Sequence, residues 1–275
     1  MKKILLCLAL LLTTMTGVYA NSLAEIKQQN KLRIGLSDKQ PPFSKYENNE
    51  FEGFEVEFAK EIAKAVTSAT NITEVEFVPV AQADRFKAVV ENRVDLLIAA
   101  FTKTPARAKE ADFSIPYFSI TLGTTSKKSL NIRKQGDLNG KKVLTIGASN
   151  SDIWVKNNPN ITQIPCKNNK DCLEKLQNGE ADAYMHNIVS IATVPLIDDE
   201  FEISIPRIGE VLFDCVVTQK GNADLLKIVN QKILDLANES FFKEAYNNTF
   251  EPFYKGLVDK KYFLLDDLYK TLLLY

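Results

Sequence analysis

The sequence predicts an α/β protein with a mixed sheet and two lobes. Apolar segments of strand length alternate with segments of helical periodicity along most of the 275 residues. This alternation favours a parallel or mixed sheet whose faces are covered by helices. A pattern also occurs twice, because residues 31–36 resemble 142–147 and residues 90–96 resemble 176–183. Two copies of one α/β plan predict two lobes with a ligand site between them.

Each element follows from its local pattern. In residues 54–66 apolar side chains recur at helical spacing, with Glu55 and other charged residues assigned to the opposite face, which predicts an amphipathic helix. Pro41 and Pro42 lack amide donors and fix φ, so residues 40–43 should form a loop. Strands are expected at residues 32–36, 75–80, 94–100, 120–125, 142–146, 161–164, 183–186, 202–205 and 211–218. Further helices or helical turns are expected at residues 84–91, 106–109, 151–157, 170–176, 188–194, 224–236 and 241–247.

The N-terminus has the three parts of a secretory signal peptide. Lys2 and Lys3 precede an uncharged run at residues 4–12, and residues 18–20 form a small-x-small cleavage site. The run is too short to cross a bilayer, because a spanning helix takes about 20 residues. Cleavage after Ala20 would leave 255 residues and change the net charge from −1 to −3. We expect an exported protein; a buried N-terminal helix is the alternative.

Composition narrows the possible partners. The chain has 34 basic and 35 acidic residues, so it lacks the positive excess that would neutralise phosphates, and no nucleic acid is expected as a partner. Cys166 and Cys172, six residues apart in an exported chain, suggest a disulfide that closes a loop. Metal binding is the weaker interpretation, since the only histidine, His186, is distant in sequence. Cys215 lies in an apolar run and should be a buried free thiol.

Several ordered motifs give the chain a resemblance to a known family. It resembles the amino-acid class (family 3) of the extracellular solute-binding proteins of ABC importers, over residues 32–253. The motifs are LRIG at 32–35, PPF at 41–43, GFEVE at 53–57, VDLLIA at 94–99, TKTPAR at 102–107, DFSIPY at 112–117 and DLNGKKV at 137–143.

The resemblance implies the type II periplasmic binding protein fold, in which each lobe is a mixed sheet flanked by helices and two hinge segments join the lobes. One lobe would hold residues 21–118 with 216–256, and the other residues 119–215. The hinges would lie near 119–122 and 212–215, so that ligand binding closes the clamp. Residues 257–275 have no counterpart in the family and are expected to form a helical extension packed on the body.

The resemblance also implies a carboxylate site. Arg107 matches the arginine that grips the ligand's carboxylate with two charge-assisted bonds; a surface pair with Glu110 or Asp112 is the alternative. Thr102 matches a hydroxyl residue that bonds the same carboxylate, or it is an ordinary strand-end threonine. Further candidate contacts are Ser37, Gln40, Phe43, Ala100, Ser149 and Asn150. Of these, Phe43 could instead be core, and Ser149 and Asn150 could be helix caps.

Other positions bear on the ligand's charge. Arg85 stands where family members that resemble binders of acidic amino acids carry an arginine; a solvated arginine is the alternative. Asn187 stands where the family usually places an aspartate for the ligand's ammonium, and Ala100 replaces a hydroxyl residue. A buried ammonium without a carboxylate is costly. Another acid would therefore supply the charge, or the ligand is not a free α-amino acid; the candidate acids are Asp38, Asp84 and Asp152. His186 is either a ligand contact or a structural histidine.

The function expected from the resemblance is a monomeric periplasmic binding protein without cofactor or metal. It would deliver a small amino acid or related carboxylate, acidic for preference, to the membrane permease of an ABC importer. One alternative is an enzyme that resembles the cyclohexadienyl dehydratases of this fold. Residues 185–190 contain no acid for that chemistry, and a single histidine leaves acid–base schemes short of groups. A ligand-sensing ectodomain partner is the other alternative.

Overall fold

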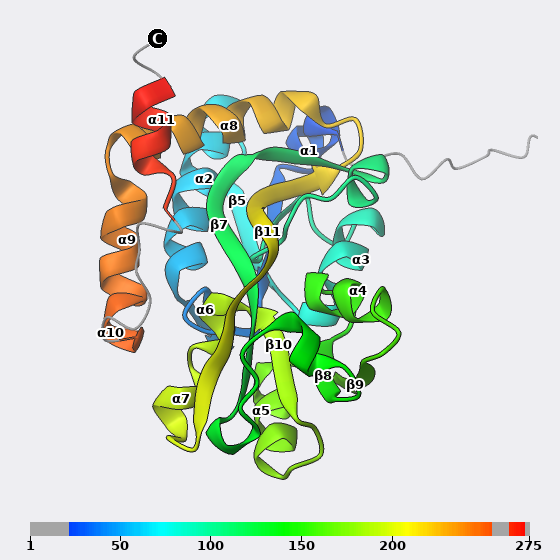
Figure 1. Cartoon of the computed structure of the whole chain (residues 1–275). Helices are drawn as coiled ribbons and strands as arrows, with labels where there is room; N and C mark the ends of the chain where they lie inside the picture. The colour runs from blue at the N-terminus through cyan, green and yellow to red at the C-terminus, as the bar shows by residue number, and fades with distance from the viewer. Residues whose placement is uncertain (1–21, 255–263, 273–275) are drawn as a thin grey trace, which may run out of the picture.

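The computed structural model describes residues 22–254 and 264–272, in which two α/β bodies are joined by a pair of long strands. Figure 1 shows an upper body, here called lobe I, that contains β1–β6, α1–α3 and α8–α11. The lower body, lobe II, contains β8–β10 and α4–α7. Strands β7 and β11 run through both bodies side by side. The predicted signal peptide at residues 1–20 lies outside the described residues.

Eleven strands in the described residues form one large and one small sheet. The eight-stranded sheet has the order β5-β1-β6-β11-β7-β10-β8-β9, and the three-stranded sheet has the order β2-β3-β4. The strands are β1 (Lys31–Ser37), β2 (Lys39–Gln40), β3 (Ser44–Glu47), β4 (Glu50–Glu52), β5 (Glu74–Val80), β6 (Leu96–Ile98), β7 (Ala111–Lys127), β8 (Lys142–Ile146), β9 (Thr162–Cys166), β10 (Ala183–Asn187) and β11 (Phe201–Gln219).

Helices cover the large sheet in both lobes (Figure 1). They are α1 (Leu23–Gln29), α2 (Phe54–Thr70), α3 (Arg85–Val90), α4 (Asn150–Lys156), α5 (Asn169–Gln177), α6 (Ile188–Ile191), α7 (Val194–Ile197), α8 (Ala223–Asn238), α9 (Phe241–Thr249), α10 (Glu251–Tyr254) and α11 (Asp266–Leu272). Single 3₁₀ turns are η1 (Gln82–Asp84), η2 (Arg107–Lys109), η3 (Lys128–Leu130) and η4 (Gln135–Leu138). The helix expected in the C-terminal extension is therefore present as α11, which packs beside α8 and α9.

Strands β7 and β11 are longer than the sequence predicts. They form one antiparallel ladder from Phe201 opposite Lys127 to Gln219 opposite Ala111, although the pattern indicates separate, shorter strands. Pro206 and Gly209, which interrupt the pattern, fall where the register shifts, so the ladder bends there without ending. The two predicted hinge segments pair with each other, since Phe213 lies opposite Ser119. The lobe boundaries inferred from the resemblance remain a prediction.

The start of α2 is fixed by the proline loop. The Pro41–Pro42 peptide bond is cis, and the carbonyls of Pro42 and Phe43 accept from the amides of Phe54 and Glu55 at 3.0 and 2.8 Å. Gly53 has φ 127°, and a Cβ there would lie 2.5 Å from the Phe43 carbonyl oxygen, so only glycine fits. The prediction that Glu55 faces solvent is wrong, because this loop turns its side chain into the protein, where it is 0% exposed.

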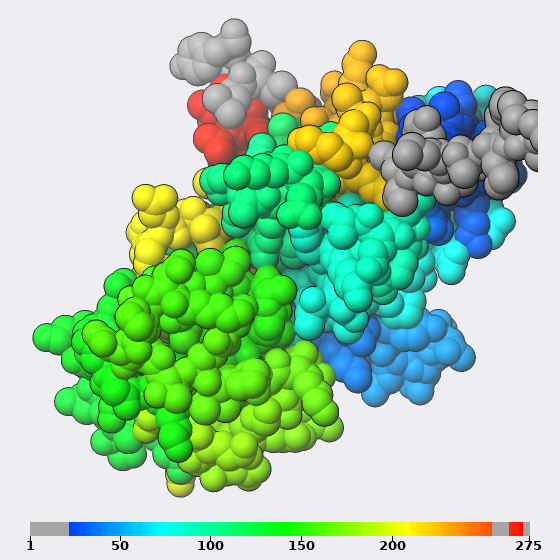
Figure 2. All heavy atoms as spheres, turned by 90° about the vertical axis from the view of Figure 1, so that its right-hand side faces the viewer, coloured from blue at the N-terminus to red at the C-terminus, as the bar shows by residue number. Residues whose placement is uncertain are grey.

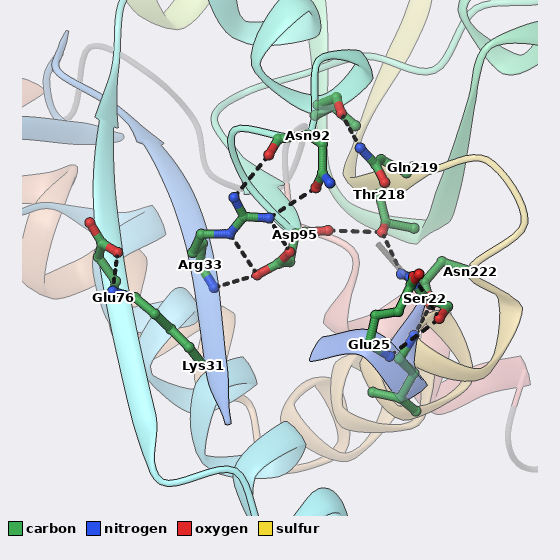
Figure 3. Close-up of polar contacts among 12 residues, drawn as sticks. Ser22, Glu25, Lys31, Arg33, Glu76, Asn92, Asp95, Thr218, Gln219 and Asn222 are labelled. Atoms are coloured by element: carbon green, nitrogen blue, oxygen red, sulfur yellow. Dashed lines mark hydrogen bonds and ion pairs between the residues drawn. The ribbon is translucent and has the colours of Figure 1, made fainter. Parts of the chain in front are cut away.

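In each lobe, the aspartate just before one strand is hydrogen-bonded to a residue of the neighbouring parallel strand. In lobe I, the Asp95 amide donates to the Arg33 carbonyl at 2.9 Å, and the Arg33 amide donates to the Asp95 carboxylate at 2.7 Å. Figure 3 shows the Arg33 guanidinium adding two further contacts to that carboxylate, from Nε and Nη2. In lobe II, Asp182 and Lys142 exchange the same two backbone-directed bonds, at 2.9 and 2.8 Å. The repeated sequence pattern therefore corresponds to a repeated structural device.

The cysteines are arranged as predicted. Cys166 and Cys172 form a disulfide with a Cα–Cα distance of 5.3 Å, between the end of β9 and the first turns of α5. Cys215 is a free, buried thiol in β11. None of the helices in the described part of the chain combines the length and the apolar composition needed to span a bilayer.

Candidate functional site

A small polar cavity lies between the lobes, next to the crossing of β7 and β11. Its volume of about 20 Å³ can hold a water molecule but not an amino acid. In Figure 2 the atoms of lobe II lie directly against those of lobe I, so the clamp is closed on this face. The residues that line the cavity are Arg85, Ala100, Phe101, Thr102, Arg107, Ile120, Leu122, Ser149, Asn150, Ser151, His186 and Asn187.

Arg107 in η2 reaches from lobe I to lobe II. Its Nη1 donates to the Thr102 carbonyl at 2.8 Å and to Asn150 Oδ1 at 3.3 Å, and its Nη2 donates to the Ala148 carbonyl at 2.8 Å. The guanidinium lies over the Phe101 ring, 4.1 Å from its centroid. Burial and Arg85 lower the pKa of Arg107 to about 10, so it remains cationic at neutral pH. The alternative surface pair with Asp112 is not formed, because Asp112 pairs with Lys220 at 2.7 Å.

Thr102 connects the cavity to a buried acid in β11. Its Oγ1 accepts from Asn150 Nδ2 at 3.0 Å and donates to Asp214 Oδ1 at 2.9 Å. Thr102 and Asp214 also form an isolated antiparallel bridge, which places the loop after β6 beside the crossing strand. Asn150, the first residue of α4, thus contacts both Thr102 and Arg107 across the interface between the lobes.

Arg85 lines the cavity but most of its donors are used within lobe I. Its Nε donates to the Gln82 carbonyl at 2.8 Å, and its Nη1 donates to the carbonyl of Ala99 at 2.7 Å and, more weakly, to that of Ala100 at 3.2 Å. The side chain is therefore not the solvated arginine of the alternative, since the residue is only 4% exposed. It fixes the loop after β6, in which Ala100 has φ 43° and ends the strand two residues earlier than predicted.

Three predicted contacts lie outside the cavity lining. Gln40 is buried and its Oε1 accepts from Arg85 Nη1 at 3.3 Å, so it stands behind the wall of the cavity. Phe43 belongs to the aromatic core of lobe I, with its ring 5.4 Å from Phe118 and 5.0 Å from Phe250. Ser37 is buried at the end of β1, and its carbonyl accepts from Ser44 Oγ at 2.6 Å.

Lobe II contributes neutral polar groups to the cavity. Ser149 caps α4, with its side chain accepting from the Asp152 amide, and its Oγ lies 2.8 Å from Ser151 Oγ. Asn187 caps α6, since its Oδ1 accepts from the Ser190 amide at 2.7 Å. Asn187 therefore takes the place predicted for it beside the cavity, but its oxygen already has a partner.

His186 is a neutral side chain in this wall. It is 4% exposed, and both ring nitrogens are buried without a partner of good hydrogen-bond geometry among the described residues. Burial, reinforced by the charge of Arg85, lowers the pKa of His186 to about 3. The imidazole therefore stays uncharged between pH 5 and 8.

None of the three acids proposed for an ammonium is among the residues that line the cavity. Asp152 is buried but accepts from the Ala148 amide at 3.1 Å and pairs with Lys156 at 2.9 Å. Asp84 is exposed, and Asp38 is half-buried at the edge of lobe I.

Two buried acids behind the wall were not predicted as site residues. Glu55 accepts from the Ala100 amide and from the Tyr117 hydroxyl, and burial raises its pKa to about 7. Burial likewise raises the pKa of Asp214 to about 7. Each carboxylate has one oxygen without a partner in the described residues. The signal for Asp214 was present in the sequence, because it is the single charged residue in the apolar run 211–217.

A two-lobed α/β protein with a polar cavity where two strands cross between the lobes is a ligand-binding clamp. Comparison with known proteins gives the family: residues 32–252 match the model of the bacterial extracellular solute-binding proteins, family 3, and the chain belongs to this family. This family is extracellular or periplasmic, and the curated relatives are amino-acid-binding proteins.

Three similar proteins are named for the amino acids that they bind. A solved solute receptor for L-cysteine from Neisseria gonorrhoeae is 32% identical, with a TM-score of 0.80 over 88% of this chain and 99% of that one. An L-cystine-binding protein of Escherichia coli K12 is 28% identical over 79% of this chain and 81% of its own. An L-glutamate/L-aspartate-binding protein of Pseudomonas aeruginosa is 26% identical over 83% and 80%. The relatives found are mostly solute-binding proteins rather than enzymes.

Proposed function

We propose that this protein binds the α-carboxylate of a small amino acid between Arg107, Thr102 and Asn150. The observation that carries the proposal is the set of bonds that Arg107 and Thr102 of lobe I make to lobe II, at 2.8 to 3.3 Å. A carboxylate placed between the same groups would accept from the guanidinium edge and from neutral donors of the other lobe. The ligand would thereby take over the bonds that Arg107 makes to lobe II, which hold the clamp closed.

The side chain of the ligand is short and uncharged in this proposal, with L-cysteine as the first candidate. The likeness to a solute receptor for L-cysteine supports it. The geometry of Arg85 also supports it, because Nε and Nη1 donate to main-chain carbonyls and only Nη2 is without a partner in the described residues. A guanidinium in that state cannot present a two-bond edge to a second carboxylate.

An acidic amino acid is the second candidate, in line with the expectation from the sequence. Arg85 lines the cavity, is buried, and would attract a second carboxylate through Nη2. The likeness to an L-glutamate/L-aspartate-binding protein supports this candidate as well. For either ligand the ammonium would meet neutral oxygens, because no carboxylate is among the lining residues that the structure describes.

Calorimetric titration of the mature chain against a panel of amino acids tests these candidates. The panel is L-cysteine, L-cystine, L-serine, L-glutamate, L-aspartate, L-glutamine and L-arginine. L-cysteine should bind most tightly, and L-glutamate would replace it if Arg85 Nη2 governs the choice. Tight binding of L-arginine alone would contradict the proposal, since two arginines already face the cavity. Native mass spectrometry of the protein as purified is an independent check.

We further propose that the ligand is handed to the permease of an ABC importer after export through a signal peptide at residues 1–20. Two experiments test this part. N-terminal sequencing of the exported protein should begin at Asn21. Uptake of radiolabelled ligand by the native cells should be lost when this gene is deleted. Turnover of prephenate-like carboxylates would instead favour the dehydratase alternative, and unchanged uptake would favour a sensor.

A further inference from the structure

Asp214 is a buried acid at the point where β11 passes between the lobes. The residue is 0% exposed, and it lies within 212–215, one of the two paired segments predicted to form the hinge. Its Oδ1 accepts from Thr102 Oγ1 at 2.9 Å, and its Oδ2 has no partner in the described residues. Asp214 is thus one hydroxyl group away from the cavity.

The hydrogen-bond capacity of Thr102 limits what it can offer a ligand. A hydroxyl has one proton to donate and two lone pairs to accept with. While Asp214 is ionised, that proton points to its Oδ1, and Asn150 Nδ2 already donates to the same hydroxyl at 3.0 Å. An ionised ligand carboxylate can only accept. Thr102 can therefore donate to the ligand carboxylate only when Asp214 no longer accepts the proton of the Thr102 hydroxyl.

We propose that Asp214 is a positioning residue that takes up one proton when a carboxylate ligand binds, which turns the hydroxyl of Thr102 towards the ligand. The inference rests on the proposed function. The proton comes from solvent and bonds to Asp214, whose O–H then donates to Thr102 Oγ1. The O–H of Thr102 donates to the ligand carboxylate, while Asn150 continues to donate to Thr102. One proton and both lone pairs of the hydroxyl are then in use.

The surroundings of Asp214 favour this uptake. Asp214 interacts electrostatically with four groups of neighbouring elements, which are Arg85 of α3, Arg107 of η2, Glu55 of α2 and Tyr117 of β7. The Cys215 thiol is adjacent on its own strand. Burial outweighs the two arginines and raises the pKa of Asp214 to about 7. An ionised carboxylate with an unpartnered buried oxygen is costly, whereas the neutral acid leaves only a carbonyl oxygen unpaired.

Ligand binding raises the same pKa further. A carboxylate beside Arg107 offsets the positive charge that favours ionised Asp214, and it adds a negative charge of its own. A group whose pKa is higher in the complex takes up protons on binding. Affinity is therefore greatest below pH 7 and falls as the pH rises through the window between the free and bound pKa values, by up to about tenfold per pH unit.

Calorimetry of the full mature chain with L-cysteine, at pH 7.5 in phosphate and in Tris, measures the uptake. The difference in observed enthalpy between the two buffers should correspond to a large fraction of one proton taken up per ligand. Asp214→Asn replaces the protonated acid with an amide that donates permanently to Thr102. It should bind with the affinity of the wild type at pH 6, without proton uptake and without a fall towards pH 8.

Two further variants assign the proton. Glu55→Gln changes the other buried acid, which makes no contact with Thr102, and should retain the uptake. Thr102→Val removes the connecting hydroxyl, so the ligand should bind more weakly and with less proton uptake than in the wild type. The ligand is the same throughout, so ionisation of its own groups cancels between variants. Wild-type binding without uptake, or unchanged uptake in Asp214→Asn, would overturn the proposal.

Failure of the ligand hypothesis is recognised separately. If L-cysteine does not bind wild type at any pH, the proposed function is at fault, and the titration is repeated with whichever amino acid of the panel binds. A carboxyl ¹³C NMR titration of the ligand-free protein, assigned with Asp214→Asn, should give a pKa of about 7 for Asp214. A pKa below about 5, close to that of a free aspartate, would overturn the inference whatever the ligand is.

Discussion

The two lobes contribute unlike chemistry to one cavity. Lobe I supplies two arginines, Arg85 and Arg107, and the buried acids Glu55 and Asp214 stand behind them. Lobe II supplies hydroxyls, two side-chain amides and the uncharged His186. The difference teaches how the cost of closure can be limited: lobe I carries the charges that would anchor a ligand, and the lining residues of lobe II bring no further charge out of water when the lobes meet.

Removing the positive charge of Arg107 should have the largest effect on ligand affinity. Arg107→Ala deletes two charge-assisted bonds, so ligand affinity should fall about 1,000-fold, equivalent to ~4 kcal/mol. Calorimetry measures the loss. The matched control is Arg133→Ala, which removes an exposed arginine paired with Glu202 in lobe II and should bind normally. Wild-type affinity in Arg107→Ala would remove the carboxylate site from the proposal.

The two aspartates that bond a neighbouring strand, Asp95 in lobe I and Asp182 in lobe II, should differ in how much they contribute to stability. Asp95→Ala leaves the Arg33 amide unpaired in a partly buried setting and breaks an ion pair whose acid side chain is 0% exposed, so the free energy of unfolding should fall by about 3 kcal/mol. Asp182→Ala removes only the exposed bond from the Lys142 amide to the Asp182 carboxylate, and should cost only about 1 kcal/mol. Urea denaturation compares the two. Equal losses would mean that the lobes do not differ in this respect.

Lobe II should matter less for affinity than lobe I. Asn150→Ala removes the hydrogen bonds that an uncharged amide makes to Thr102 and Arg107, and the ligand should bind about tenfold more weakly. Asn160→Ala, at an exposed position of the same lobe, is the control. A loss as large as that of Arg107→Ala would show that closure rather than charge supplies most of the binding free energy.

His186 should have the smallest effect on the pH dependence. Its pKa of about 3 keeps it neutral from pH 5 to 8, so the ratio of affinities at pH 6 and pH 8 should be the same in His186→Gln as in wild type. Titrations at the two pH values test this. If the substitution flattens the profile, His186 rather than Asp214 carries the linked proton.

Much of the cavity could be predicted because the family resemblance assigns ligand contacts to motifs at strand ends and helix starts. The order of the motifs placed Arg107, Thr102 and Asn150 at the ends of strands or the starts of helices, and the fold brings these ends together. Hydrophobic periodicity likewise indicated α2 and the alternation of strands and helices that builds the large sheet, because the spacing of apolar residues within one element can be read from its own sequence.

Other features depended on contacts that no local pattern encodes. Glu55 has helical spacing typical of the solvent face, yet the Gly53 turn directs it to Tyr117 and the Ala100 amide. Asp214 lies in a predicted hinge segment, but its local sequence indicates no role for it because its partner Thr102 is 112 residues away. The continuity of β11 was hidden by Pro206 and Gly209, which register shifts accommodate.

The double crossing of the chain has a consequence for the order in which the molecule is built. Every strand of lobe II that lies outside the crossing pair falls between β7 and β11 in sequence, so this lobe is an uninterrupted stretch. Lobe I is split, and its sheet is complete only after the last residues of β11 have been made. The half that begins first during synthesis is therefore finished last, and β6 must wait with an unpaired edge until the distant strand β11 has been made.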